Sequence, residues 1–232
     1  MKLVLFDIDG TILWSDGAGR RAMTAALEEL VGGAGPSGYR YDGRTDPQIA
    51  REIMEHEGVD APRIAELIPV LLDRYLVLLE TELRTRTLRL FPGVVELVAR
   101  LERESDVIPG LLTGNIRAGA ELKLRAAGLD TARFRVGAYG SDHAERPELP
   151  AIAQRRAQEA LGAQVAGRDI FVIGDTPMDI ACGRGIGARA IAVATGFYGV
   201  SPITKMSRPA TCAPSASCAR RCAMAGSSGR SA

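Results

Sequence analysis

The chain has 232 residues, with 29 basic and 28 acidic side chains and a formal net charge of +1. This length fits one core with a sizeable insertion, and the balanced charge offers no electrostatic footprint for nucleic acid or an acidic membrane surface. No apolar run approaches the ~20 residues of a membrane span, and no signal-peptide pattern follows Met1. We therefore expect a cytoplasmic monomer or homodimer that acts on a small molecule.

The first stretch, Leu3 to Phe6, is a continuous apolar run typical of a strand covered on both faces. Asp7 and Asp9 follow it, and Gly10 allows a tight turn. In open parallel sheets ligands bind at the carboxyl ends of the strands, so both carboxylates are expected in a crevice. A divalent cation such as Mg²⁺ would relieve their repulsion. The alternative is an ordinary turn, since Asp and Gly are common there.

The next 70 residues have helical rather than strand-like patterns. An Ala- and Leu-rich helix is predicted over 17–31, a second begins at Asp46-Pro47 with Asp46 as its N-cap and runs to Gly58, and a third follows Asp60. The third carries an apolar stripe of Ile64, Leu67, Ile68, Leu71, Leu72, Tyr75 and Leu79. Together they predict a helical cap over residues 15–88.

Alternating helices and strands resume after Pro92. Helices are predicted over 94–104, 117–127 and 150–161, and strands over 110–112, 136–138, 170–173 and 190–193. Because Pro109 cannot donate to a sheet ladder, we expect the first of these strands to begin only after it. The order predicts an α/β protein whose doubly wound parallel sheet is formed by residues 1–14 and 89–200.

Composition changes after Gly199. Residues 201–232 contain five basic residues, no acidic residue and little apolar periodicity. Such a segment buries too little surface to offset the cost of ordering, so we predict a disordered basic tail.

Three later polar clusters each follow a strand-like run: Thr113-Gly114-Asn115, then Glu145-Arg146-Pro147, then Asp175 through Asp179. With Asp7-Ile8-Asp9-Gly10-Thr11 they appear in the motif order of the haloacid dehalogenase superfamily, which residues 1–199 resemble. The helical insertion resembles the cap of its phosphoglycolate-phosphatase-like branch. The resemblance implies a Rossmann-like core with an inserted cap, and Mg²⁺ as cofactor.

Chemistry gives each residue a role within that resemblance. Asp7 would attack phosphorus and form an aspartyl-phosphate, while Asp9 would serve as general acid and base. Thr113, Gly114 and Asn115 would bind the phosphoryl group. Asn115 could also orient a neighbouring carboxylate or cap the following helix, and capping is the favoured of these two roles. The metal set would be Asp7, Asp9 through its backbone carbonyl as the resemblance implies, Asp175 and Asp179. The last two are four residues apart and would share one face of a helical turn.

Two arginines complete the predicted site. Arg146 stands where relatives usually have a lysine, and Arg135 and Arg155 are its rivals. Arginine is no conservative replacement for a compact ammonium, so the geometry of this motif is a departure from the family pattern. Arg44, in the segment that resembles the site-facing part of the relatives' caps, either touches substrate or belongs to the lead-in of the helix that begins at Asp46.

These features predict a Mg²⁺-dependent phosphatase of a small phosphate monoester. A phosphomutase of the same fold would share all the core residues, and a non-catalytic phosphate-ligand-binding protein is the alternative of a different class. A dehalogenase is disfavoured because the chain retains Asp9, which halide release does not need.

Overall fold

The computed structural model describes residues 1–162 and 164–198, and the predicted tail over 201–232 lies outside them. A five-stranded parallel sheet has the order β5-β4-β1-β6-β7. Its strands are β1 (Lys2–Phe6), β4 (Val107–Thr113), β5 (Val136–Tyr139), β6 (Ile170–Gly174) and β7 (Arg189–Ala192). A two-stranded ribbon of β2 (Leu13–Trp14) and β3 (Arg89–Leu90) stands beside it.

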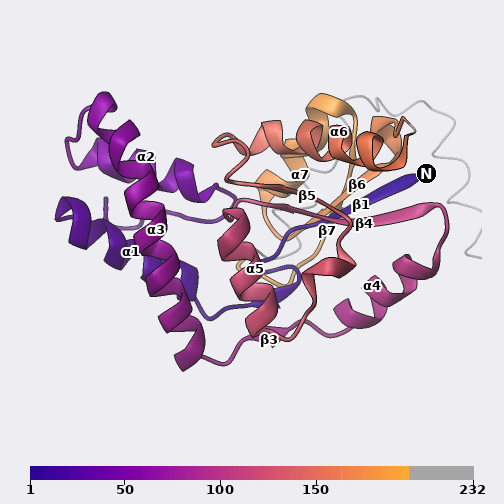
Figure 1. Cartoon of the computed structure of the whole chain (residues 1–232), viewed down its shortest axis with the longest axis horizontal. Coiled ribbons are helices and arrows are strands. Elements are labelled where there is room, and N and C mark those ends of the chain that lie inside the picture. Colours follow the sequence, from indigo (N-terminus) through magenta and orange to yellow (C-terminus); the bar gives the residue numbers. More distant parts are fainter. Residues whose placement is uncertain (163, 199–232) are drawn as a thin grey trace, which may run out of the picture.

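Helices cover both faces of the sheet (Figure 1). One face packs on α4 (Val94–Arg103) and α5 (Arg117–Ala126), and the other on α6 (Leu149–Leu161). Successive residues of β1 alternate between these layers, because Val4 and Phe6 point to the first and Leu3 and Leu5 to the second. The prediction of a strand buried on both faces is confirmed.

Strand β4 begins earlier than predicted, at Val107 rather than after Pro109. Pro109 pairs with Val4, and its carbonyl accepts from Arg135 N at 3.0 Å. In a parallel strand the N–H and C=O of one residue face the same neighbour, and on that side β5 starts only opposite Gly110. The missing N–H of proline therefore costs the ladder no hydrogen bond.

Three helices form a second body with its own apolar core, at the left of Figure 1: α1 (Ala18–Val31), α2 (Asp46–His56) and α3 (Ala61–Thr85). We call this body the helical unit. The stripe predicted on α3 is buried at Ile64, Leu67, Leu71, Tyr75 and Leu79. Thr45, not Asp46, is the N-cap of α2, because its side chain accepts from Gln48 N. Asp46 is the first helical residue, which frees its carboxylate for another partner.

The helical unit is joined to the core through the start of α2. Asp46 N donates to Gly114 O at 2.8 Å, and Asp46 Oδ2 accepts from Ile116 N at 2.8 Å. Thr45 Oγ1 donates to Ala144 O at 2.5 Å. The helical unit is therefore hydrogen-bonded to the two loops that follow β4 and β5. Among the described residues no helix is long and apolar enough to cross a membrane.

Candidate active site

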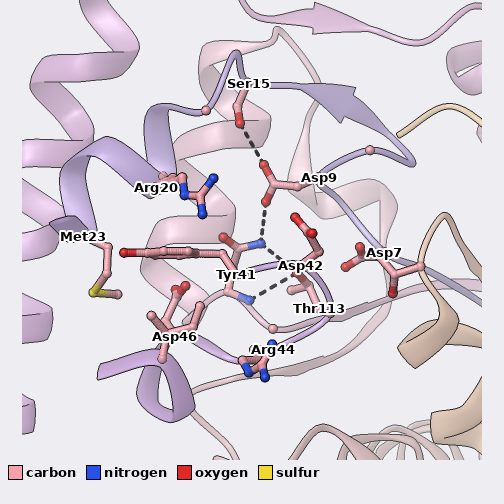
Figure 2. Close-up of a pocket in the computed structure, with 18 of the residues that line it drawn as sticks. Asp7, Asp9, Ser15, Arg20, Met23, Tyr41, Asp42, Arg44, Asp46 and Thr113 are labelled. Carbon is pink, nitrogen blue, oxygen red and sulfur yellow. Dashed lines mark hydrogen bonds between the residues drawn. The ribbon is translucent and has the colours of Figure 1, made fainter. Parts of the chain in front are cut away.

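The carboxyl ends of the three central strands meet at the floor of one cavity. Asp7 follows β1, Thr113 ends β4, and Asp175 follows β6, so the central position of β1 places Asp7 between the other two. The cavity holds about 160 Å³. Figure 2 shows Asp7 and Asp9 on one side of it and Arg20, Tyr41 and Asp46 of the helical unit on the other.

Three buried carboxylates converge at the floor. One oxygen each of Asp7, Asp175 and Asp179 lies within 4.8 Å of the others. Burial, together with the neighbouring charges of Asp7 and Asp179, raises the pKa of Asp175 to about 8. Burial also raises the pKa of Asp7, and the facing Arg146 guanidinium only partly opposes this rise. Crowded buried carboxylates that resist ionisation call for a cation in addition to Arg146, which pairs with Asp7 and Asp179.

This donor set fits the divalent ion that the sequence resemblance implies. Oxygen ligands from carboxylates are those that Mg²⁺ prefers. Asp9, in contrast, turns its carboxylate away from this cluster and into a separate ion pair. The carboxylate of Asp9 is thus outside the acidic cluster, which is compatible with the expectation that only its backbone carbonyl would contribute.

Asp175 and Asp179 do not share a helical turn as the spacing predicted. Helix α7 (Pro177–Cys182) begins after Asp175, with Thr176 as its N-cap. Asp179 Oδ2 accepts from Thr176 N at 2.9 Å and Oγ1 at 2.7 Å in a capping box, and its Oδ1 accepts from Arg146. Asp179 therefore both caps α7 and belongs to the acidic cluster.

Arg146 is the buried cation of the floor. Its Nη2 lies 3.1 Å from Asp7 Oδ1 and also donates to Asp179 Oδ1, and its side chain is 3% exposed. Its Nε has no hydrogen-bond partner among the described residues. One terminal nitrogen thus bridges two carboxylates. The rivals Arg135 and Arg155 do not line the cavity.

Asn115 orients a carboxylate and does not cap α5, whose N-cap is Ile116. The Asn115 amide donates to Asp9 Oδ2 at 2.9 Å and to Thr113 Oγ1 at 2.8 Å. The prediction that capping was its favoured role was wrong. The backbone N–H of Ile116 is instead satisfied by Asp46 from the helical unit.

Arg44 and Gly114 both line the cavity. The Arg44 guanidinium, however, binds groups outside the floor of the cavity. It donates to Glu52 Oε2 at 3.1 Å and to Arg40 O at 2.7 Å, and it lies over the ring of Tyr39. Arg20 of α1, which was not predicted, also lines the cavity, stacked on Tyr41. Its guanidinium donates to the Tyr39 carbonyl and has no carboxylate partner among the described residues.

Lys123 is the second residue that the sequence reasoning missed. It projects from α5 and lines the cavity with a side chain only 4% exposed. Its Nζ donates to Asp9 Oδ2 at 2.6 Å and to Asn115 Oδ1 at 2.6 Å. Burial alone would raise the pKa of Asp9, but Lys123, Asn115 and Ser15 outweigh it and hold that pKa below its ordinary value. The signal was present, since Ile116, Ala120, Lys123 and Leu124 form one helical stripe with a lysine among apolar residues.

A parallel α/β core with an aspartate after its first strand, facing a second acidic loop across a buried cation, defines a class of hydrolytic enzymes. Residues 4–184 match the model of the haloacid dehalogenase-like hydrolases. The chain belongs to this family of hydrolases.

Individual relatives agree with this assignment. The chain is 27% identical over 201 residues to a phosphoglycolate phosphatase of Synechococcus elongatus, with 85% of each chain covered. A hydrolase from Pseudomonas syringae shares the fold with a TM-score of 0.66 and 21% identity, covering 89% of this chain and 90% of that one. CbbY from Rhodobacter sphaeroides, solved in complex with phosphate, gives a TM-score of 0.64 at 20% identity over 86% and 89% of the two chains.

Proposed function

We propose that the protein is a Mg²⁺-dependent phosphatase of small phosphate monoesters that works through an aspartyl-phosphate. The observation that carries this proposal is the buried cluster of Asp7, Asp175 and Asp179 around Arg146 at the floor of the cavity. Family membership and the phosphatase among the relatives support it.

The first step is attack of an Asp7 carboxylate oxygen on phosphorus, which forms a P–O bond to Asp7 as the ester P–O bond breaks. Asp9 takes up a proton from solvent before this step, since its contacts favour the carboxylate, and donates that proton to the departing oxygen, so the product leaves as a neutral alcohol. In the second step water attacks the same phosphorus and gives a proton to Asp9, and Asp7 departs as a carboxylate. The sum is one ester and one water converted to one alcohol and inorganic phosphate.

The remaining residues bind charge and exclude water. Arg146 favours the ionised form of Asp7 and aligns its carboxylate, because its Nη2 lies 3.1 Å from Asp7 Oδ1. Thr113 and Gly114 bind phosphoryl oxygens beside Asn115. Mg²⁺, held by Asp7, Asp175, Asp179 and the Asp9 carbonyl, would neutralise charge on the phosphoryl oxygens. The helical unit acts as a cap that seals the cavity from bulk water.

The substrate we propose carries a second anionic group, as phosphoglycolate does. Arg20 supports this, because it faces the cavity from the side opposite Asp7 and no carboxylate neutralises it among the described residues (Figure 2). Because the Arg44 guanidinium is already paired with Glu52, Arg20 is the better candidate to bind the second anionic group of the substrate. The likeness to a phosphoglycolate phosphatase points the same way.

The test is phosphate release from phosphoglycolate, sugar phosphates and nucleotides, with Mg²⁺ and with EDTA. Acid quench after mixing with a ³²P-labelled substrate is expected to trap label on the wild-type protein, lost on hydroxylamine treatment, and none on Asp7→Asn. Phosphate release that persists unchanged in EDTA would refute the metal role. An isomerised ester in place of phosphate would identify a phosphomutase.

Arg20 is tested with a pair of esters of matched length, phosphoglycolate and 2-hydroxyethyl phosphate. Arg20→Gln is expected to raise KM about 10-fold or more for phosphoglycolate and to leave KM for 2-hydroxyethyl phosphate unchanged, since loss of a charge-assisted hydrogen bond to the carboxylate costs ~1.5–3 kcal/mol. Arg63→Gln is the matched control, because Arg63 is exposed and pairs with Glu66 on the surface. Equal effects of Arg20→Gln on both esters would refute the second-anion site.

A further inference from the structure

Lys123 is a buried residue whose ammonium group contacts Asp9, and Asp9 faces the cavity. The Lys123 side chain is 4% exposed, whereas that of Asp9 is 37% exposed. Both lysine contacts, to Asp9 Oδ2 and Asn115 Oδ1, are 2.6 Å long. Lys123 thus lies at the wall of the cavity with its ammonium held by Asp9 and Asn115, and Asp9 is the more exposed member of the ion pair.

The Asp9 carboxylate is fixed from three directions. Ser15 Oγ donates to its Oδ1 at 2.9 Å, and Asn115 Nδ2 and Lys123 Nζ both donate to its Oδ2. Of the three donors only Lys123 is charged, so it alone adds the attraction of an ion pair to its hydrogen bond with the carboxylate. Lys123 is thus the donor that determines where Oδ2 sits.

The helical unit closes the other sides of Lys123. Gly19 of α1 leaves room for the ammonium, since a Cβ at that position would lie 2.9 Å from Nζ. Asp46 of α2 is a buried carboxylate that faces Lys123, and Tyr75 of α3 lines the same cavity. All three helices of the unit therefore contribute to the enclosure of one core lysine. If the unit moved away, Lys123 would be exposed to water and its hold on Asp9 would weaken.

We propose that Lys123 is a positioning residue that sets the Asp9 carboxylate for proton transfer only while the helical unit is closed over the core. This inference rests on the proposed function, because it assigns Lys123 to the acid–base step of that reaction. Lys123 does not touch substrate, and because its charge favours the ionised form of Asp9, what it gives to proton donation is position and not acidity. The proton passes from Asp9 to the departing oxygen, so the lysine acts through the geometry of Asp9.

The test uses two substrates that differ in how much the leaving group needs a proton. An alkyl phosphate releases a poor leaving group and depends on general acid catalysis, whereas p-nitrophenyl phosphate releases a stable phenolate and depends on it little. The readout is kcat/KM, which covers events up to transfer of the phosphoryl group to Asp7 and omits the later hydrolysis. Lys123→Met is expected to lower kcat/KM about 100-fold for the alkyl ester and less than about 10-fold for p-nitrophenyl phosphate.

Three controls separate positioning from folding. Lys2→Met makes the same replacement at an exposed pair with Asp106 and is expected to change neither ratio. Lys123→Gln, which keeps a donor and lacks the charge, serves if Lys123→Met melts early. Adding Lys123→Met to Asp9→Asn is expected to cause little further loss on the alkyl ester, because both changes remove one function.

The outcomes are distinguishable. Equal losses on both esters, or a full additional loss in the Asp9→Asn background, would overturn the positioning role and leave the phosphatase proposal standing. A wild-type protein inactive on every phosphate ester would overturn the proposed function and this inference with it. A loss confined to the alkyl ester supports both.

Discussion

Magnesium binding is expected to compete with protons at Asp175, so affinity for the ion will rise with pH. The pKa of this carboxyl is raised from 3.8 to about 8 by burial and by the charges of Asp7 and Asp179. The ion binds the ionised form, so below pH 8 each ion must first displace a proton. At about pH 6 this costs ~2.7 kcal/mol relative to the fully ionised carboxylate, two pH units at 1.36 kcal/mol each, and because half of the groups are still protonated at pH 8, Kd is weakened ~50-fold relative to pH 8. The raised pKa of Asp7 adds to the effect in the same direction.

Isothermal titration calorimetry with MgCl₂ at both pH values, in two buffers of different ionisation enthalpy, measures Kd and the protons released. At least about one proton per ion is expected at pH 6 from the raised pKa of Asp175. Asp175→Asn is expected to weaken binding and flatten its pH dependence, whereas Asp73→Asn, at an exposed carboxylate, leaves both unchanged. A wild-type Kd that is constant between these pH values, with no proton release, would refute the reasoning.

Three further predictions concern single residues. Asp7→Asn is expected to lower turnover by on the order of 10⁴-fold or more with a native circular dichroism spectrum, and wild-type turnover would exclude the covalent route. Gly114→Ala places a Cβ against the Arg44 carbonyl, so it is expected to lower the free energy of unfolding by roughly 1–3 kcal/mol and to lower kcat/KM. The control Gly185→Ala has open space around the added Cβ and is expected to leave the melting curve unchanged. Arg146→Lys is expected to keep kcat within about 10-fold of wild type and Arg146→Met to lose ~100-fold or more, because one charged donor suffices; equal losses in both would show that the fork is needed.

The sheet could be predicted because its strands are continuous apolar runs ending in polar residues. Leu3 to Phe6 shows this pattern most clearly, and its two-faced burial follows from local sequence alone. The extra residues of β4 could not be predicted, since the tolerance for Pro109 depends on where β5, which begins at Val136, starts to pair. The local rule that proline cannot donate a backbone hydrogen bond predicts a later start of the strand. The register of β4 and β5 shows that no ladder hydrogen bond is lost at Pro109.

The acidic cluster was predictable for a similar reason, because Asp7 and Asp175 each follow a strand of one parallel sheet. For Lys123 the apolar stripe around it signals burial, but its partner could not be predicted, since Asp9 lies 114 positions away and a lysine in a helix is ordinarily solvated. The contact of Asp46 with Ile116 spans 70 positions and joins the helical unit to the core. These two unpredicted contacts, Lys123 with Asp9 and Asp46 with Ile116, lie where the helical unit meets the core. Neither of these two bodies alone determines which polar groups become buried there.

Arg146 shows how a residue can depart from the family pattern while its contacts remain those of a point charge. A fork that bound a carboxylate with two nitrogens would have no equivalent in lysine. Here Nη2 alone reaches Asp7 and Asp179, and the buried Nε is left without a partner among the described residues. An unsatisfied buried donor costs roughly 1–3 kcal/mol. The arginine therefore gains nothing at its Nε, and a lysine could supply the same bridge without that cost. We therefore expect the floor to require one fixed positive charge between two carboxylates at this position, a requirement that either side chain would meet.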